Sequence, residues 1–202
     1  MEAYGATRKM TGGLQNEDAW LILREPCLIV ALADGSGSAH FVAKKALRFL
    51  ERLLRVEPLE NLCRFSTWET AFRNVDSYLA GSGFETTLIA GAFIGEGIYG
   101  ASCGDSRAYL VHPRDAYLNS IANDGKPRIG SGEASIKPLH AKFPEDAIVL
   151  FESDGAWAQI DRLSIQRALR MQTHFSDVPS LLLSHANKRG CADDMTVVAV
   201  RR

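Results

Sequence analysis

The order of apolar and polar segments in this sequence predicts an α+β fold, in which sheets pack together and helices lie outside them. Two strand-like segments precede two helix-like segments, and the second half of the chain repeats this order. The 202 residues are enough to bury the core of one domain without disulfide bonds. Hydrophobic residues make up 46% and charged residues 23% of the chain, as in ordinary globular proteins. Because we find no internal repeat, low-complexity tract or linker, we expect a single domain over residues 1–202.

Short runs of aliphatic and aromatic residues, bounded by turn residues, predict the strands. The predicted strands cover residues 19–24, 27–33, 86–94, 97–103, 107–112, 147–152 and 195–200. Glu25-Pro26 separates the first two, and glycine-containing turns separate the three in the middle of the chain. Residues 113–146 have only weak signals and are expected to form a loop-rich stretch.

Helical periodicity predicts four helices, of which the first runs from a cap at Ser36 or Ser38 to about Arg55. Its apolar stripe consists of Ala39, Ala43, Ala46, Leu47, Leu50 and Leu54. A basic stripe of Lys44, Arg48, Arg52 and Arg55 predicts a solvated face, with a docking face as the alternative. The other helices are expected at 66–79, beginning at a capping box formed by Ser66 and Glu69, and at 161–171 and 178–188. The tryptophans Trp20, Trp68 and Trp157 are expected in the core.

The charge balance of 23 basic and 24 acidic residues argues against nucleic acid or an anionic membrane as a partner. No apolar run approaches the ~18 residues of a membrane-spanning helix, and the acidic N-terminus does not resemble a secretory signal. The four cysteines form no close pair, and no cysteine or histidine has the spacing of a zinc site. We therefore expect a cytoplasmic protein with reduced thiols, with an isolated redox role as the alternative.

Acidic residues stand where four of the predicted strands begin or end. They are Glu17 and Asp18 before strand 19–24, Asp34 after strand 27–33, Glu152 and Asp154 at the end of strand 147–152, and Asp193 and Asp194 before strand 195–200. If these strands share sheets, their ends converge and bring several carboxylates together. Crowded carboxylates cannot all stay ionised cheaply unless a cation neutralises them. Oxygen ligands without Cys or His suit Mg²⁺ or Mn²⁺.

The plainer interpretation of any single Asp-Gly pair is a turn, because this dipeptide is common in turns. Asp124-Gly125 follows a mixed stretch rather than an apolar run, and we interpret it as such a turn. Asp34-Gly35 and Asp154-Gly155 instead follow full apolar runs. Together with the separate acidic pairs, they favour a metal site.

Six short motifs, taken in order, carry a resemblance to a known family. They are Asn16-Glu17-Asp18-Ala19, Ala33-Asp34-Gly35-Ser36-Gly37, Glu85-Thr86-Thr87-Leu88, Gly104-Asp105-Ser106-Arg107-Ala108-Tyr109-Leu110, Ser153-Asp154-Gly155 and Asp193-Asp194-Met195-Thr196-Val197-Val198. Over nearly the whole chain, this set resembles the metal-dependent protein phosphatases of the 2C class, as a small bacterial-type member. The resemblance implies a four-layer α–β–β–α sandwich of two antiparallel sheets flanked by helices, with a two-metal site at one end of the sheets.

The resemblance also implies catalytic and metal-binding roles for individual residues. Asp34 would bridge two Mn²⁺ or Mg²⁺ ions, and Gly35 would offer its carbonyl to one of them. Asp154 and Asp193 would complete the other ion's ligands. The two ions would share a water whose deprotonated form attacks the phosphorus of a phosphoserine or phosphothreonine. The implied partner is a phosphoprotein, such as the target of a cognate kinase.

Three further acidic positions match the family's pattern. Glu17 and Asp18 match its acidic pair, of which the glutamate acts through metal-bound water. Asp105 matches an aspartate that belongs to a third, weaker metal site in bacterial members.

The sequence departs from the family at several positions. Gly13 stands where the family often has an arginine that grips the substrate phosphate, and Arg8 and Lys9 just upstream are candidates to supply that charge. Ser36 replaces the general-acid histidine of many eukaryotic members. Only 49 positions separate Asp105 from Asp154, so the flap beside the active site is expected to be short, as in small regulatory phosphatases of bacterial stress and sporulation pathways.

Two other functions are weighed against the phosphatase. A catalytically weak 2C-like module that regulates by protein contact would explain Gly13 and the short flap, but not the full set of aspartates. A nucleotide-binding loop at residues 35–40 is disfavoured, since it lacks the third glycine of a dinucleotide fingerprint and the lysine of a P-loop.

Overall fold

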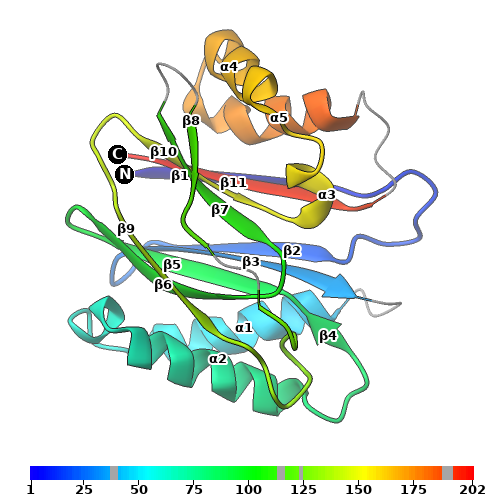
Figure 1. Ribbon diagram of the computed structural model, residues 1–202, viewed down its shortest axis with the longest axis vertical. Coiled ribbons are helices and arrows are strands. Elements are labelled where there is room, and N and C mark those ends of the chain that lie inside the picture. The colour runs from blue at the N-terminus through cyan, green and yellow to red at the C-terminus, as the bar shows by residue number, and fades with distance from the viewer. Residues whose placement is uncertain (37–40, 113–116, 123–124, 188–192) are drawn as a thin grey trace.

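A computed structural model describes residues 1–36, 41–112, 117–122, 125–187 and 193–202, in which two antiparallel sheets face each other (Figure 1). The first sheet has the strand order β1 (Glu2–Arg8), β11 (Met195–Arg201), β10 (Ile148–Glu152), β7 (Arg107–His112) and β8 (Tyr117–Ser120). The second has the order β2 (Asp18–Leu23), β3 (Leu28–Ser36), β5 (Leu88–Ile94), β6 (Gly97–Cys103) and β9 (Lys137–Lys142), and the short β4 (Glu85–Thr86) pairs with the end of β3.

Helices cover the outer face of each sheet, so the predicted four-layer α–β–β–α sandwich is confirmed (Figure 1). The helices on the second sheet are α1 (Val42–Leu54) and α2 (Phe65–Leu79), and a 3₁₀ turn at Asn61–Cys63 leads into α2. Those on the first sheet are α4 (Arg162–Met171) and α5 (Val178–Asn187), together with the single-turn α3 (Asp154–Trp157) and a 3₁₀ turn at Phe175–Asp177. No helix in the described part of the chain combines the length and the apolar content needed to span a membrane.

The central strands are apolar on both faces because both of their faces are buried. In β3, Ile29, Ala31 and Ala33 pack against α1 and α2. The alternating residues Leu28, Val30 and Leu32 pack between the sheets. Strands β10 and β11 divide their side chains in the same way between the inter-sheet core and the layer of α4 and α5. Because both faces of these strands are packed, the positions of the strand ends are fixed.

A strand occurs in each of the seven predicted segments, although Thr87 interrupts the segment 86–94 between β4 and β5. Three strands were not predicted, and all three lie at sheet edges: β1, β8 and β9. An edge strand has one neighbour and one open side, so its sequence carries a weaker apolar pattern. The prediction that 113–146 is mainly loop is therefore wrong for β8 and β9.

Both predicted caps of the first two helices are wrong. Helix α1 begins at Val42, because β3 continues through Ser36, which pairs with Glu85. Ser38, Ala39 and His40 lie outside the described residues. Helix α2 begins one residue before the predicted box, and Arg64 precedes it without a side-chain cap. The basic stripe of α1 is exposed, as expected.

Of the three tryptophans expected in the core, only Trp68 is fully buried. Trp20 is 38% exposed, with its ring lying over Gly5. Trp157 is half-buried and belongs to the candidate site described below.

Candidate functional site

Four of the carboxylates singled out from the sequence come from both sheets to one end of the sandwich. Asp18 and Asp34 stand directly opposite each other in the register of β2 and β3. Asp154 opens α3 just after β10, and Asp193 stands two residues before β11, the antiparallel neighbour of β10. The ends of these strands meet on the side of the molecule where α3 lies (Figure 1). We call these four residues the Asp34 cluster.

A hydrogen bond between Ser153 and Asp18 joins the two sheets at this point. Ser153 Oγ donates to Asp18 Oδ2 at 2.8 Å and accepts from the backbone N–H of Thr196 at 2.9 Å. The Thr196 hydroxyl lies 2.7 Å from that of Thr7 on β1. Asp18 is only 3% exposed, so this network fixes the direction of its carboxylate.

Two buried threonines hold the backbone of Asp34. Thr87 Oγ1 accepts from the Asp34 N–H at 2.9 Å, while the Thr87 N–H donates to the Asp34 carbonyl at 2.8 Å. Thr86 Oγ1 donates to the same carbonyl at 2.9 Å, and the Ser106 hydroxyl lies 2.7 Å from that of Thr87. The break between β4 and β5 thus supplies the contacts that orient Asp34.

The segment before β2 is held from two sides. Asp194, which is 5% exposed, accepts from the backbone N–H groups of Met10 at 2.7 Å and Glu17 at 2.5 Å. The Gly35 N–H donates to the Glu17 carbonyl at 3.3 Å, and a Cβ at Gly35 would lie 3.1 Å from that oxygen. The structure therefore separates two neighbours that the sequence presents as a pair: Asp194 binds backbone, whereas Asp193 is exposed.

Burial and repulsion between carboxylates raise the pKa values of Asp18, Asp34 and Asp193. Burial raises the pKa of Asp34 most, and the charges of Asp18, Asp154 and Asp193 raise it further, to about 9. Burial likewise raises the pKa of Asp18 to about 7, although two hydrogen bonds to its carboxylate act in the opposite direction. Asp154 raises the pKa of Asp34 in two ways, through its negative charge and as a side-chain hydrogen-bond partner.

The donor set of the Asp34 cluster suits a hard divalent cation. Asp18 Oδ1 and Asp154 Oδ1 are buried and have no hydrogen-bond partner among the described residues. Within the same described ranges, no three His, Cys, Asp or Glu side chains are already arranged to bind a metal ion. Asp34 instead faces the charges of Asp18, Asp154 and Asp193, each of which disfavours its ionisation. Unpaired carboxylate oxygens and repulsion between neighbouring carboxylates are features that a bound cation would satisfy and relieve.

Asp105 differs from the Asp34 cluster because it has a cationic partner. Arg128 Nη2 donates to both Asp105 oxygens, at 2.9 and 2.7 Å. Trp157 Nε1 donates to the Asp105 carbonyl at 3.0 Å, and the Arg107 guanidinium stacks on the Trp157 ring at 3.4 Å. The charge of Arg128 also acts on Asp34 and Asp154. Arg128 is not among the residues singled out from the sequence, since a lone arginine in a stretch of weak signals matches no motif.

Comparison with protein-family models and with curated protein sequences gave no match. Solved structures do match. A bacterial serine phosphatase with an arginine-to-alanine substitution aligns over 99% of this chain and 97% of its own, with a TM-score of 0.87 and 21% identity. The catalytic domain of the serine/threonine protein phosphatase PstP, in complex with two manganese ions, aligns over 98% and 96%, with a TM-score of 0.82 and 23% identity. Stp1 from Staphylococcus aureus aligns over 100% and 94%, with a TM-score of 0.82 and 20% identity.

This chain has the protein phosphatase 2C fold. The matches cover both sheets and all the helices, as the coverage of each chain shows. The recognition made from six short motifs is therefore confirmed at the level of the fold.

In this 2C fold, Gly13 lies in the loop between β1 and β2. Its N–H donates to the Met10 carbonyl at 3.3 Å, and a Cβ at this position would meet Met10 Cγ at 2.8 Å. Lys9 Nζ donates to the Leu14 carbonyl at 3.4 Å, so this lysine is engaged within its own loop. Arg8, at the end of β1, is exposed.

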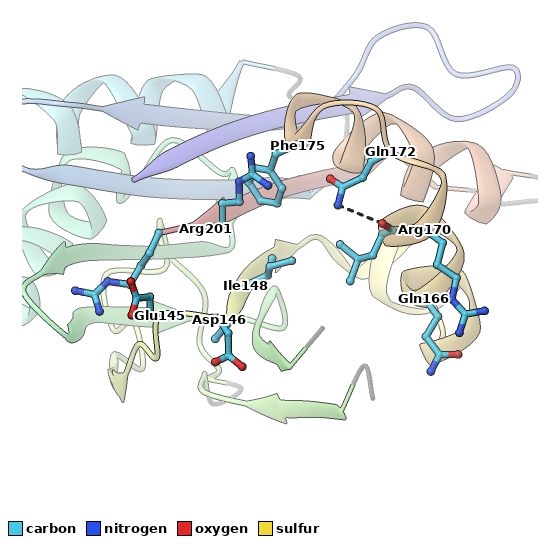
Figure 2. A pocket seen from close by; sticks show the side chains of 11 residues that line it. Glu145, Asp146, Ile148, Gln166, Arg170, Gln172, Phe175 and Arg201 are labelled. Carbon is cyan, nitrogen blue, oxygen red and sulfur yellow. Dashed lines mark hydrogen bonds between the residues drawn. The ribbon is translucent and has the colours of Figure 1, made fainter. Parts of the chain in front are cut away.

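A cavity of about 370 Å³ is lined by Ser36, two residues after Asp34, and by Glu85, Lys126, Pro127 and Arg128. Another, of about 410 Å³, lies at the opposite ends of β10 and β11, under α4 (Figure 2). There Arg201 stacks on Phe175 at 4.5 Å and forms an ion pair with Glu2. None of the carboxylates of the Asp34 cluster lines either cavity, and we place the candidate site at the strand ends where these carboxylates converge.

Proposed function

We propose that this chain is a metal-dependent protein phosphatase that hydrolyses phosphoserine and phosphothreonine. The observation that supports it most is the convergence of four carboxylates at one end of the sandwich, where the buried Oδ1 atoms of Asp18 and Asp154 have no hydrogen-bond partner among the described residues. A fold shared with a phosphatase that binds two manganese ions adds to this support. Such a site needs cations to ionise fully.

The residues that would hold two Mn²⁺ or Mg²⁺ ions are the ones implied by the resemblance. Asp34 would lie between the ions, with the Gly35 carbonyl on one and Asp154 and Asp193 on the other. Glu17 would act through water. When bound, divalent cations supply an activated water and neutralise the oxygens of a phosphoryl group.

The neighbouring residues of the chain orient these ligands. Thr86 and Thr87 fix the backbone of Asp34, and Ser153 holds the Asp18 carboxylate by a hydrogen bond to Oδ2. Asp194 fixes the Glu17 backbone by accepting a hydrogen bond from its N–H. These contacts restrict the backbone of Asp34 and of Glu17 and the carboxylate of Asp18, which limits how far these residues must move to bind a metal ion.

The direct test is hydrolysis of p-nitrophenyl phosphate and of a phosphothreonine peptide, with Mn²⁺, with Mg²⁺ and with EDTA. We expect activity with metal, none in EDTA, and recovery when metal is added back. Equal turnover in EDTA would contradict the two-metal mechanism. Mn²⁺ binding at the Asp34 cluster without hydrolysis of any phosphopeptide would favour the alternative, a 2C-like module that regulates by protein contact.

We also propose that the substrates are phosphoproteins of a kinase signalling pathway and that the protein acts in the cytoplasm. The near-neutral net charge of −1 supports a protein partner rather than nucleic acid. Cell fractionation and a phosphoproteome comparison between wild-type and deletion strains would test both points.

A further inference from the structure

The carboxylate of Asp105 is already bound by a cation that belongs to the protein. A single nitrogen of Arg128, Nη2, contacts both of its oxygens, and the two side chains are only 25% and 19% exposed. A metal ion at Asp105 would need those same oxygens. Asp105 as it stands therefore fits a third metal ion poorly, although the resemblance implies one there.

The segment that carries Arg128 is fixed on both sides of it. Before it, Gly125 and Gly104 exchange backbone hydrogen bonds at 2.7 and 3.0 Å. After it, Ile129 and Thr86 exchange a second pair, at 2.9 and 3.1 Å. Thr86 also bonds the Asp34 carbonyl, so Arg128 is tied to the same strand ends as the Asp34 cluster.

A buried aspartate on α2 organises the turn that follows. Asp76 is 2% exposed, and its carboxylate accepts from the backbone N–H groups of Gly130 at 2.7 Å, Gly132 at 3.1 Å and Ala134 at 3.1 Å. Three such bonds to one buried carboxylate hold the turn in a single conformation. Arg128 is thus placed by the fold and does not depend on a flexible loop to reach Asp105.

We propose that Arg128 is a built-in cation that takes the place of a metal ion at Asp105. The guanidinium stays charged at every physiological pH and satisfies both carboxylate oxygens, so a divalent cation would have to displace it and face its charge. The inference builds on the proposed function, because it divides the acidic residues of that site into a metal-binding group and an arginine-bound one. The chain should therefore bind the two divalent cations implied for the Asp34 cluster, and no third cation at Asp105.

The test is the number of Mn²⁺ ions bound per chain, measured by equilibrium dialysis with metal analysis and by the electron paramagnetic resonance signal of free Mn²⁺. Arg128→Gln should bind one more Mn²⁺ than the wild type, and the double variant Arg128→Gln/Asp105→Asn should return to the wild-type number. An equal number in Arg128→Gln and the wild type would overturn the proposal. Since the readout is a difference, a wild type that binds no Mn²⁺ would contradict the proposed function and leave this comparison intact.

Asp105→Asn alone tests the same point without removing the arginine. It should leave the Mn²⁺ number unchanged, and the loss of one ion would overturn the proposal even if Arg128→Gln failed to fold. Arg128→Lys keeps a cation and should keep the wild-type number. The matched control is Arg73→Gln, which removes an arginine that is paired with Glu69 and bonded to the Ala134 carbonyl of the same turn. It should not change Mn²⁺ binding.

Discussion

The Asp34 cluster and Asp105 meet the same electrostatic problem in different ways. In the Asp34 cluster, four carboxylates converge, and burial and repulsion raise the pKa of Asp34 to about 9, which favours its protonated form at neutral pH. At Asp105, a single carboxylate is neutralised by Arg128. Among the described residues, no lysine or arginine forms an ion pair with the Asp34 cluster. A metal ion can displace a proton from the Asp34 cluster, whereas Arg128 stays bound to Asp105 because its segment is fixed. Only the Asp34 cluster should therefore respond to metal and pH.

Asp34→Asn should have the largest effect, because it removes the carboxylate that every other member of the cluster acts upon. We expect phosphatase activity to fall on the order of 10³-fold, as several kcal/mol of transition-state stabilisation are lost. Steady-state assays with Mn²⁺ and calorimetric titration of Mn²⁺ would measure the loss of activity and of metal affinity.

The control for this variant is an exposed aspartate away from the site. Asp124, the control that the sequence suggested, lies outside the described residues. Asp146, in the turn before β10, is exposed, and Asp146→Asn should be silent. Near wild-type kcat in Asp34→Asn would mean that the reaction occurs elsewhere on the molecule.

Without metal, the stability of the protein should fall as the pH rises. The folded protein holds protons on Asp18 and Asp34 up to pKa values of about 7 and 9, whereas the ordinary value is 3.8. The folded state therefore binds more protons than the unfolded state, and its stability decreases from about pH 4 to 9. In EDTA, we expect Tm to drop by about 5 °C or more between pH 5 and 9. Asp34→Asn should flatten the upper part of this curve, and saturating Mn²⁺ should remove the slope.

Sequence patterns predicted the central strands and missed most of the edges. Strands buried on both faces, such as β3 and β11, have continuous apolar sequences, and such short apolar runs are recognisable as strands. The unpredicted β1, β8 and β9 are edge strands, whose formation depends on a partner supplied from elsewhere in the chain. Helix α1 begins later than expected for a similar reason, since pairing with β4 keeps Ser36 in β3.

The acidic residues of the site could be identified from the sequence. The contacts that give neighbouring acidic residues different roles could not. Asp193 and Asp194 are adjacent and chemically identical, and only the fold sends Asp194 to the backbone of Glu17. Arg128 lies 23 residues after Asp105, in a stretch with only weak signals, so their ion pair is visible only in three dimensions. The Thr-Thr motif was recognised as a family signature, and its role in holding Asp34 came from the structure.

Thr87→Val tests whether the Asp34 cluster depends on its support. Valine keeps the shape of threonine but cannot accept the Asp34 N–H or contact the Ser106 hydroxyl. Changes to such supporting groups cost about 10–100-fold in metal affinity or activity, and we expect a loss in this range. Titration of Mn²⁺ would measure it, with Thr70→Val, an exposed position on α2, as the control. An unchanged Mn²⁺ affinity would show that Asp34 is held by its strand alone.

The smallest effect is expected from a substitution at Gly13, which concerns binding of the substrate phosphate. If Arg128 is committed to Asp105, the phosphate lacks the arginine that the family often places at the position of Gly13. Charge-assisted hydrogen bonds are worth roughly 1.5–3 kcal/mol each, or about tenfold to a hundredfold in binding. Gly13→Arg should recover part of this binding free energy and lower KM for p-nitrophenyl phosphate several-fold. The substitution can be accommodated because the side chain of Met10 that faces the new Cβ is flexible.

Arg8→Ala and Lys9→Ala should change KM little. A large rise in KM for Arg8→Ala would show that the phosphate contact has moved to β1, and an unchanged or higher KM in Gly13→Arg would show that this loop does not face the phosphate.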